Sequence, residues 1–233
     1  MIKRWLTAFI ALMLVSGGAV AQMAFVEGTD YQAINPPVET TQPDKVVVTE
    51  MFWYGCPHCF RFEPYVERWA ASLPEGVVFE QVPSVLNQSW IEHARAYYSF
   101  VTMGVLDQVH RNFFDAIHLK RQRLNTLDSI AEFVAGQGLD EEAFRKHYFS
   151  FPVETQIRKN ANKEKRYGHR GVPAIIVNGK YLVSASLAGS NERMIEIMNF
   201  LVSRELEGAV ASSTLHTSVP GSDHCPIELQ IEL

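Results

Sequence analysis

Cys56 and Cys59, two cysteines separated by two residues, are the residues whose type and spacing most directly suggest chemistry. They follow an apolar run rich in β-branched residues, and we expect a helix to begin at Cys56. The first turn of a helix has unpaired backbone N–H groups and the positive end of the helix dipole, and both stabilise a thiolate. Cys59 lies on the same helical face, within disulfide reach. The pair therefore predicts reversible thiol–disulfide exchange.

The two residues between the cysteines support this interpretation. Pro57 suits the first helical turn, where its missing N–H costs no hydrogen bond. His58 can add a hydrogen bond or, when protonated, a positive charge to the thiolate of Cys56. The alternative is that His58 is a solvent-exposed spacer. A lowered thiolate pKa makes Cys56 a better leaving group and its disulfide more oxidising.

Three other uses of the cysteine pair are disfavoured. A structural disulfide across so short a loop would contribute only about 2 kcal/mol in the chain-entropy model. Haem attachment requires a histidine directly after the second cysteine, where Phe60 stands. A metal site needs two further ligands at compatible spacing. Four histidines elsewhere in the chain form no paired motif: His93, His110, His118 and His169.

The elements that must position the cysteines are strands and helices in alternation. β-Branched and aromatic runs indicate strands, and apolar residues at helical spacing indicate helices. Asn178-Gly179 is a strong signal for a two-residue hairpin turn. Trp90 and His118 are expected to pack between helices. The predicted order is a strand at Lys45–Tyr54, a helix at Cys56–Ser72, a strand at Val77–Val82, helices from Trp90 to Tyr167, strands at Gly171–Val177 and Lys180–Val183, and a helix at Asn191–Glu207.

This order predicts an α/β fold in which a compact domain is interrupted by a block of helices. We expect residues 22–86 and 168–207 to form the two parts of the α/β domain, and residues 87–167 to form the helical insertion. The hydrophobic fraction of 47% supports a substantial core.

The first 21 residues have the features of a secretory signal peptide. Lys3 and Arg4 precede an apolar stretch, Trp5–Val15, and small residues end at Ala21. A transmembrane anchor is the alternative, but these 11 apolar residues are well short of the roughly 20 that span a bilayer. We therefore expect cleavage after Ala21 and export of the mature protein.

Charge and cysteine content disfavour two classes of protein. Removal of Lys3 and Arg4 with the signal peptide takes the formal net charge from −5 to −7, which disfavours nucleic-acid binding. Three cysteines are too few for a small secreted fold held together by disulfides. A protein with so few cysteines in an oxidising compartment is expected to use its thiols for chemistry.

The motifs together resemble the DsbA family of thioredoxin-fold proteins. The segment Cys56–Cys59 is similar to the family's active-site sequence, and Phe52–Gly55 resembles members from pseudomonad-type bacteria. Gly171–Ala174, followed by Val177–Tyr181, is similar to the family's second signature. The resemblance covers about Met23–Glu207. It implies a thioredoxin-like domain interrupted by an inserted all-helical domain.

The resemblance also implies roles for residues outside the cysteine motif. It implies a cis peptide bond between Val172 and Pro173, beside the disulfide, so that the backbone of this loop can pair with a substrate chain. Glu50 matches a family position where a buried acid lies beneath the disulfide and relays a proton to or from Cys59; the alternative is that Glu50 faces solvent. Glu63 matches the family pattern too, but as a charge on a helix we expect it on a solvated face.

The function implied is that of a monomeric periplasmic oxidase that donates its Cys56–Cys59 disulfide to newly exported, reduced proteins. A quinone-linked inner-membrane partner of DsbB type would reoxidise it, and no bound cofactor or metal would be needed. A reductase or an isomerase is the first rival, although isomerases of this compartment usually have a dimerisation domain, and too little chain precedes Lys45 to form one. The second rival is a peptide-binding chaperone with incidental cysteines.

The tail, residues 208–233, departs from the family and is expected to be disordered. Gly221–Ile227 resembles the C-terminal end of exonuclease/endonuclease/phosphatase-type nucleases. Without the rest of that fold, Asp223 and His224 have no catalytic partners, so we expect no nuclease activity. Cys225 is interpreted as a stray thiol.

Overall fold

The computed structural model describes residues 25–217, with side chains described up to residue 209. The predicted signal peptide lies outside the described residues, as does the nuclease-like segment with Cys225. The strands are β1 (Gln32–Ala33), β2 (Val46–Phe52), β3 (Val77–Pro83), β4 (Ala174–Val177) and β5 (Tyr181–Ser184). The helices are α1 (Pro57–Ala70), α2 (Ile91–Met103), α3 (Leu106–His118), α4 (Leu127–Gly136), α5 (Glu141–Tyr148), α6 (Phe151–Tyr167), α7 (Ala185–Ala188) and α8 (Asn191–Thr217), with a 3-10 turn at Gln88–Trp90.

The five strands form one mixed sheet in the order β1-β5-β4-β2-β3. β2 runs parallel to β3, and the other neighbouring pairs are antiparallel. All seven residues of β2 are buried, as expected of a β-branched strand in the middle of a sheet. In the register of the sheet, Glu50 lies opposite Gln81 on β3 and Ile175 on β4.

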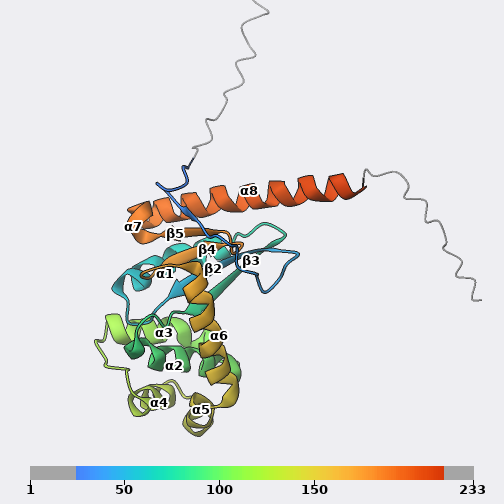
Figure 1. The fold of residues 1–233 in the computed structure, drawn as a ribbon. Helices are drawn as coiled ribbons and strands as arrows, with labels where there is room; N and C mark the ends of the chain where they lie inside the picture. Colours follow the sequence, from blue (N-terminus) through green and yellow to red (C-terminus); the bar gives the residue numbers. More distant parts are fainter. Residues whose placement is uncertain (1–24, 218–233) are drawn as a thin grey trace, which may run out of the picture.

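Helices cover both faces of the sheet. Because side chains alternate along a strand, Val46 and Val48 of β2 point to one face, where they pack with α1 and α8. Met51 points to the opposite face and packs with Tyr167 at the end of α6. Figure 1 shows α8 running along one side of the sheet, and α6 extending from the sheet towards the other helices. Glu50 lies two residues after Val48 on the same strand, so its side chain points to the same face, towards α1.

The helices α2 to α6 stand between β3 and β4 in the chain and pack around an aromatic core. This core includes Phe100, Phe113 and Phe144, and it continues into Tyr54 and Cys59. The block of helices therefore closes over the end of β2 from which the cysteine motif follows (Figure 1). The predicted fold class, an α/β domain interrupted by helices, is confirmed.

The prediction that the last helix ends at Glu207 is wrong, because α8 continues to Thr217. A single glycine inside a helix costs only about 1 kcal/mol relative to alanine, so Gly208 does not end it. The two-residue β1 and the four-residue α7 have no counterpart among the predicted elements, since so few residues carry no periodic pattern. No helix within residues 25–217 is both long and apolar enough to cross a membrane.

The turn between β4 and β5 has a strict requirement for glycine. Asn178 and Gly179 have φ values of 49° and 65°, and a Cβ atom on Gly179 would lie 1.8 Å from the carbonyl oxygen of Val38. We expect Gly179→Ala to lower the free energy of unfolding by roughly 3 kcal/mol or more, because it adds a backbone clash to the left-handed strain. Gly104→Ala is the matched control, since Gly104 has φ 69° with no atom within 4 Å of its Cβ position.

Urea unfolding of both variants checks this expectation. Gly104→Ala should lose only the conformational cost, about 1 kcal/mol. Equal losses for the two variants would show that the close approach of Val38 to Gly179 does not matter.

Candidate active site

The cysteine motif forms the start of α1 and is separated from the end of β2 by three residues. Cys56 is the N-cap residue, with an extended backbone (φ −87°, ψ 116°), and its sulfur accepts a hydrogen bond from the backbone N–H of Cys59 at 3.4 Å. Pro57 occupies the first turn, as predicted from its missing N–H. Both cysteines are free thiols, so the structure has the reduced form. Helix geometry therefore directs unpaired N–H groups at the sulfur of Cys56.

The pKa of the Cys56 thiol is lowered to about 6. The largest cause is a hydrogen bond from the thiol of Cys59, and burial of Cys56 opposes it. The backbone N–H groups of Cys59 and His58 and the charge of His58 lower the pKa further. Each of these groups stabilises the charged form of the sulfur.

Cys59 has the opposite character. Its side chain is fully buried, and burial raises the pKa of its thiol well above the ordinary value. The neighbouring Cys56 and Glu50 raise it further. At neutral pH the reduced site therefore combines one thiolate, at Cys56, with one thiol, at Cys59.

His58 is exposed at the surface, and its Nδ1 lies 3.0 Å from a guanidinium nitrogen of Arg61. The two sequence interpretations of His58 are therefore not exclusive. Its ring lies in solvent like a spacer, while its backbone N–H and its charge act on Cys56.

The loop before β4 reaches the cysteines from the other part of the chain. The Val172–Pro173 peptide bond is cis, as the family resemblance implies. In its protonated form, the thiol of Cys56 donates a hydrogen bond to the carbonyl oxygen of Val172 at 3.4 Å. A groove of about 830 Å³ begins here, lined by this loop, by His58 and by residues between Leu182 and Asn191.

Glu50 lies in the interior beneath the cysteines, not at the surface. It is fully buried, and its Oε2 accepts a hydrogen bond from Nε2 of Gln81 at 2.9 Å. Burial raises the pKa of Glu50 well above its ordinary value, and the charges of Glu63 and Cys56 add to this effect. A carboxyl group with a raised pKa is therefore placed where its charge is felt by Cys59.

The prediction that Glu63 lies on a solvated face of its helix is wrong. Glu63 is only 1% exposed, because its side of α1 packs against β3 and the block of helices. Nε2 of Gln81 donates to both of its carboxylate oxygens, at 3.2 and 3.1 Å. Nε2 of His110 lies 3.1 Å from Oε1.

The sequence interpretation did not identify four neighbours of the site: Tyr54, Gln81, His110 and His118. Tyr54 directly precedes the motif and is fully buried. His118 lies 2.8 Å from the carbonyl oxygen of Tyr54 and stacks on Phe60, so it does more than pack between helices. Trp90 stacks on Trp53 at 4.6 Å, in keeping with the packing role predicted for it. A signal was available for His110, since it shares the buried face of its helix with Phe113 and Phe114.

Within residues 25–217, no group of three or more His, Cys, Asp or Glu side chains is arranged to hold a metal ion.

Comparisons with known proteins agree with this geometry. Residues 47–194 match a family model described as a DSBA-like thioredoxin domain. The chain is 36% identical over 204 residues to the thiol:disulfide interchange protein DsbA of Pseudomonas aeruginosa, covering 88% of this chain and 97% of that protein. It is 40% identical over 178 residues to the Azotobacter vinelandii DsbA, covering 76% and 83% of the two chains.

Solved structures give the same result. The crystal structure of Pseudomonas aeruginosa DsbA matches with a TM-score of 0.76 and 36% identity, covering 79% of this chain and 96% of that one. The Xylella fastidiosa oxidoreductase DsbA matches with a TM-score of 0.74 and 32% identity, covering 78% and 98%. A thiolate–thiol pair at the start of α1, the cis-proline loop and these relatives all lead to one conclusion. The chain belongs to the DsbA family of thioredoxin-fold thiol:disulfide oxidoreductases.

Proposed function

We propose that this enzyme works as an oxidase in the periplasm, where it donates the Cys56–Cys59 disulfide to reduced proteins that have just been exported. The observation that carries the proposal is the asymmetry of the pair. A thiolate stabilised at Cys56 favours the reduced enzyme, and whatever stabilises the reduced enzyme makes its disulfide a stronger oxidant. The predicted signal peptide and the family support the periplasmic location.

The exchange takes place in two steps. A substrate thiolate attacks the sulfur of Cys56, the Cys56–Cys59 bond breaks, and Cys59 leaves with the electron pair and takes a proton. A second substrate thiolate then attacks the substrate sulfur of the mixed disulfide and expels Cys56 as a stable thiolate. The substrate loses two electrons and gains a disulfide, and the enzyme is left reduced. We assign to Glu50 the supply of the proton to Cys59.

The remaining site residues stabilise the Cys56 thiolate or bind the substrate chain. Pro57 fits the first turn of the helix, and His58 stabilises the Cys56 thiolate. The Val172–Pro173 loop offers backbone groups to an extended substrate chain lying in the adjoining groove. Electrons leave the reduced enzyme through a quinone-linked inner-membrane partner of DsbB type. The redox group is the disulfide itself, without a bound cofactor. The protein works as a monomer.

The reduction potential of the cysteine pair tests the proposed direction. A pKa lowered from 9.0 to about 6 stabilises the reduced enzyme about 11-fold at pH 7, which raises the potential by roughly 30 mV. Measured in glutathione buffers, the potential should lie well above the roughly −270 mV of thioredoxin. Thiolate absorbance, with Cys56→Ser as the blank, should titrate near pH 6. A thioredoxin-like potential with a near-normal thiol pKa would instead indicate a reductase.

A further inference from the structure

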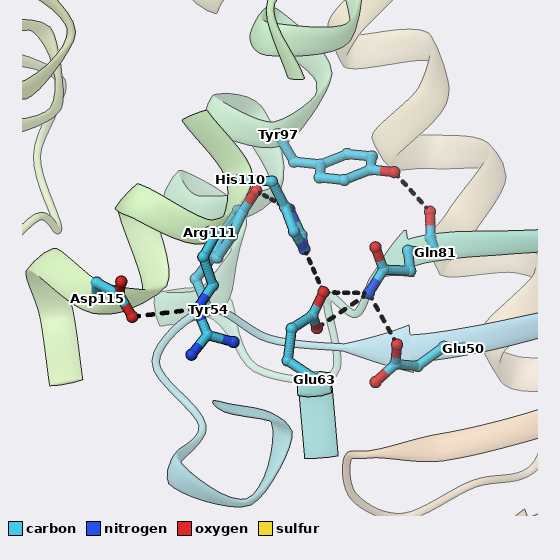
Figure 2. A network of polar contacts seen from close by, with 8 residues as sticks. All are labelled: Glu50, Tyr54, Glu63, Gln81, Tyr97, His110, Arg111 and Asp115. Carbon is cyan, nitrogen blue, oxygen red and sulfur yellow. Dashed lines mark hydrogen bonds and ion pairs between the residues drawn. The ribbon is translucent and has the colours of Figure 1, made fainter. Parts of the chain in front are cut away.

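Four buried side chains and the half-buried Gln81 form a continuous polar network next to the cysteines, the buried four being Glu50, Tyr54, Glu63 and His110 (Figure 2). They come from β2, the segment after it, α1, β3 and α3. The amide of Gln81 lies between the two carboxyl groups and donates to both. His110 contacts only one of the two acids, Glu63, and Tyr54 lies on the far side of its ring. The network is therefore not symmetric about Gln81.

The hydrogen bonds of His110 can be given a direction. The Tyr54 hydroxyl and Nδ1 of His110 are 2.7 Å apart. Burial raises the pKa of Tyr54 well above its ordinary value, so the hydroxyl keeps its proton and is available as a donor. An ionised carboxylate only accepts, so beside an ionised Glu63 the neutral imidazole of His110 carries its proton on Nε2 and donates it to Oε1 at 3.1 Å. Nδ1 then accepts from the Tyr54 hydroxyl, and Tyr54 thus stabilises the tautomer that makes His110 a donor to Glu63.

The two acids differ in how well their charged forms are satisfied. Glu63 accepts from His110 and, at both of its oxygens, from Gln81. Glu50 accepts at Oε2 only, and its buried Oε1 has no hydrogen-bond partner in the described part of the chain. Two neighbouring buried carboxyl groups do not both ionise readily, so they hold one proton between them. Hydrogen bonds to the ionised form decide which acid is charged.

We propose that Tyr54 and His110 are positioning residues that hold Glu63 as the carboxylate and thereby leave the shared proton on Glu50. The inference deepens the proposed function and rests on it, because the proton matters only if Cys59 is a leaving group. When the Cys56–Cys59 bond breaks, the proton moves from Glu50 to the sulfur of Cys59. One of the two protons released by the substrate thiols then restores Glu50, and the other goes to solvent.

Other charged and titratable groups around the pair do not take over this task. Glu50 faces Cys56, Cys59 and Glu63 from α1, and Gln81 from β3. Tyr97 of α2 donates to the backbone carbonyl of Gln81 and not to either carboxylate. Arg111 of α3 pairs with Asp115 at 3.3 Å and is partly exposed, and the ion pair drawn for it is with Asp115 and not with Glu50 or Glu63 (Figure 2). His110 is therefore the donor that distinguishes Glu63 from Glu50.

Nuclear magnetic resonance of the reduced protein, labelled with ¹³C at the glutamate side chains, tests the proposal. The chemical shift of each assigned carboxyl carbon reports whether that acid is neutral or ionised. At pH 7 the carbon of Glu50 should show the neutral acid and that of Glu63 the carboxylate. A neutral Glu63 beside an ionised Glu50 would overturn the proposal.

Two tyrosine variants form a matched pair, since each loses one buried hydroxyl. In Tyr54→Phe the proton on His110 is free to move to Nδ1, so Glu63 loses its donor. The ratio of proton on Glu50 to proton on Glu63 should then fall roughly 10-fold, as expected for one lost hydrogen bond to a charged group. Tyr97→Phe should leave both carbons unchanged. Equal shifts in the two variants would mean that general loosening of the core, not the tautomer of His110, moves the proton.

Replacement of the histidine itself gives a second, independent test. His110→Gln keeps an N–H donor near Glu63 and should retain the wild-type carboxyl shifts, whereas His110→Leu removes the donor and should behave like Tyr54→Phe. Wild-type shifts in His110→Leu would contradict the proposal. The carboxyl chemical shifts are measured without turnover, so they do not depend on whether the enzyme works as an oxidase or a reductase. If the enzyme proves to be an oxidase but the shared proton lies on Glu63, only the present inference is overturned.

Discussion

Cys56→Ser should abolish disulfide transfer, while Cys59→Ser should accumulate a covalent complex with its reaction partner. Without Cys56 the enzyme cannot form the disulfide that a substrate attacks, and we expect the rate to fall by a factor of roughly 10³ or more, the scale seen when an enzyme loses its nucleophile. In Cys59→Ser the Cys56 thiolate still attacks the disulfide of an oxidised peptide and expels one peptide thiolate. The mixed disulfide then persists, because Cys59 is absent and cannot displace the peptide.

Mass spectrometry under non-reducing conditions distinguishes the two variants. Cys59→Ser should carry one peptide per chain, released by a reducing agent, and Cys56→Ser should carry none at this site. A peptide-binding chaperone with incidental cysteines would give a different pattern, with the protection of unfolded proteins unchanged in both variants and no covalent complex in either. That pattern would refute the assignment of Cys56 as the exchanging sulfur.

The reduced protein should gain stability relative to the oxidised protein as the pH rises from 5 to 8. The folded structure lowers the pKa of Cys56 from 9.0 to about 6, so the folded state releases its proton at a lower pH than the unfolded state does. The resulting stabilisation is complete only above the unfolded pKa and disappears as the pH falls through 6. It should amount to about 2.7 kcal/mol at pH 8, about 1.4 kcal/mol at pH 7 and about 0.1 kcal/mol at pH 5.

Urea unfolding of both redox forms across this range measures the effect. The difference between the two forms cancels the titration of groups that behave alike in both. Cys59 does not disturb the window, since its raised pKa keeps it protonated in the folded state and the unfolded thiol ionises only near pH 9. In reduced Cys56→Ser this pH dependence should be absent. A constant difference between reduced and oxidised wild type from pH 5 to 8 would show that Cys56 is not a stabilised thiolate.

The parts of this molecule that local rules determine were predictable from the sequence. The cysteine motif follows a buried strand, so the cap at Cys56 and the place of Pro57 follow from helix geometry alone. The hairpin at Asn178-Gly179 follows from the preference of these residues for positive φ. The pattern also located the block of helices between the strands, although it could not show how those helices pack.

Contacts between distant segments could not be predicted in this way. Glu63 reads as a solvated residue because a single helix does not reveal what covers it, and its partner His110 lies 47 residues further along the chain. For the same reason Glu50 could be placed on either face of its strand, because alternation says which residues share a face but not which face holds an acid. Family resemblance supplied the cis bond at Pro173, which the sequence pattern alone left as a choice between cis and trans.

The buried acids lower the stability of the fold, although one of them is assigned a role in catalysis. Interior carboxyl groups cost solvation energy, and apolar residues of similar volume often make a core more stable. A laboratory selection for survival at high temperature would therefore favour an apolar replacement at Glu50. Enzymes obtained in this way would keep their cysteines and lose the group assigned to deliver a proton to the leaving sulfur. Thermostabilised variants should accordingly be screened for turnover as well as for melting temperature, because the most stable among them would be the slowest.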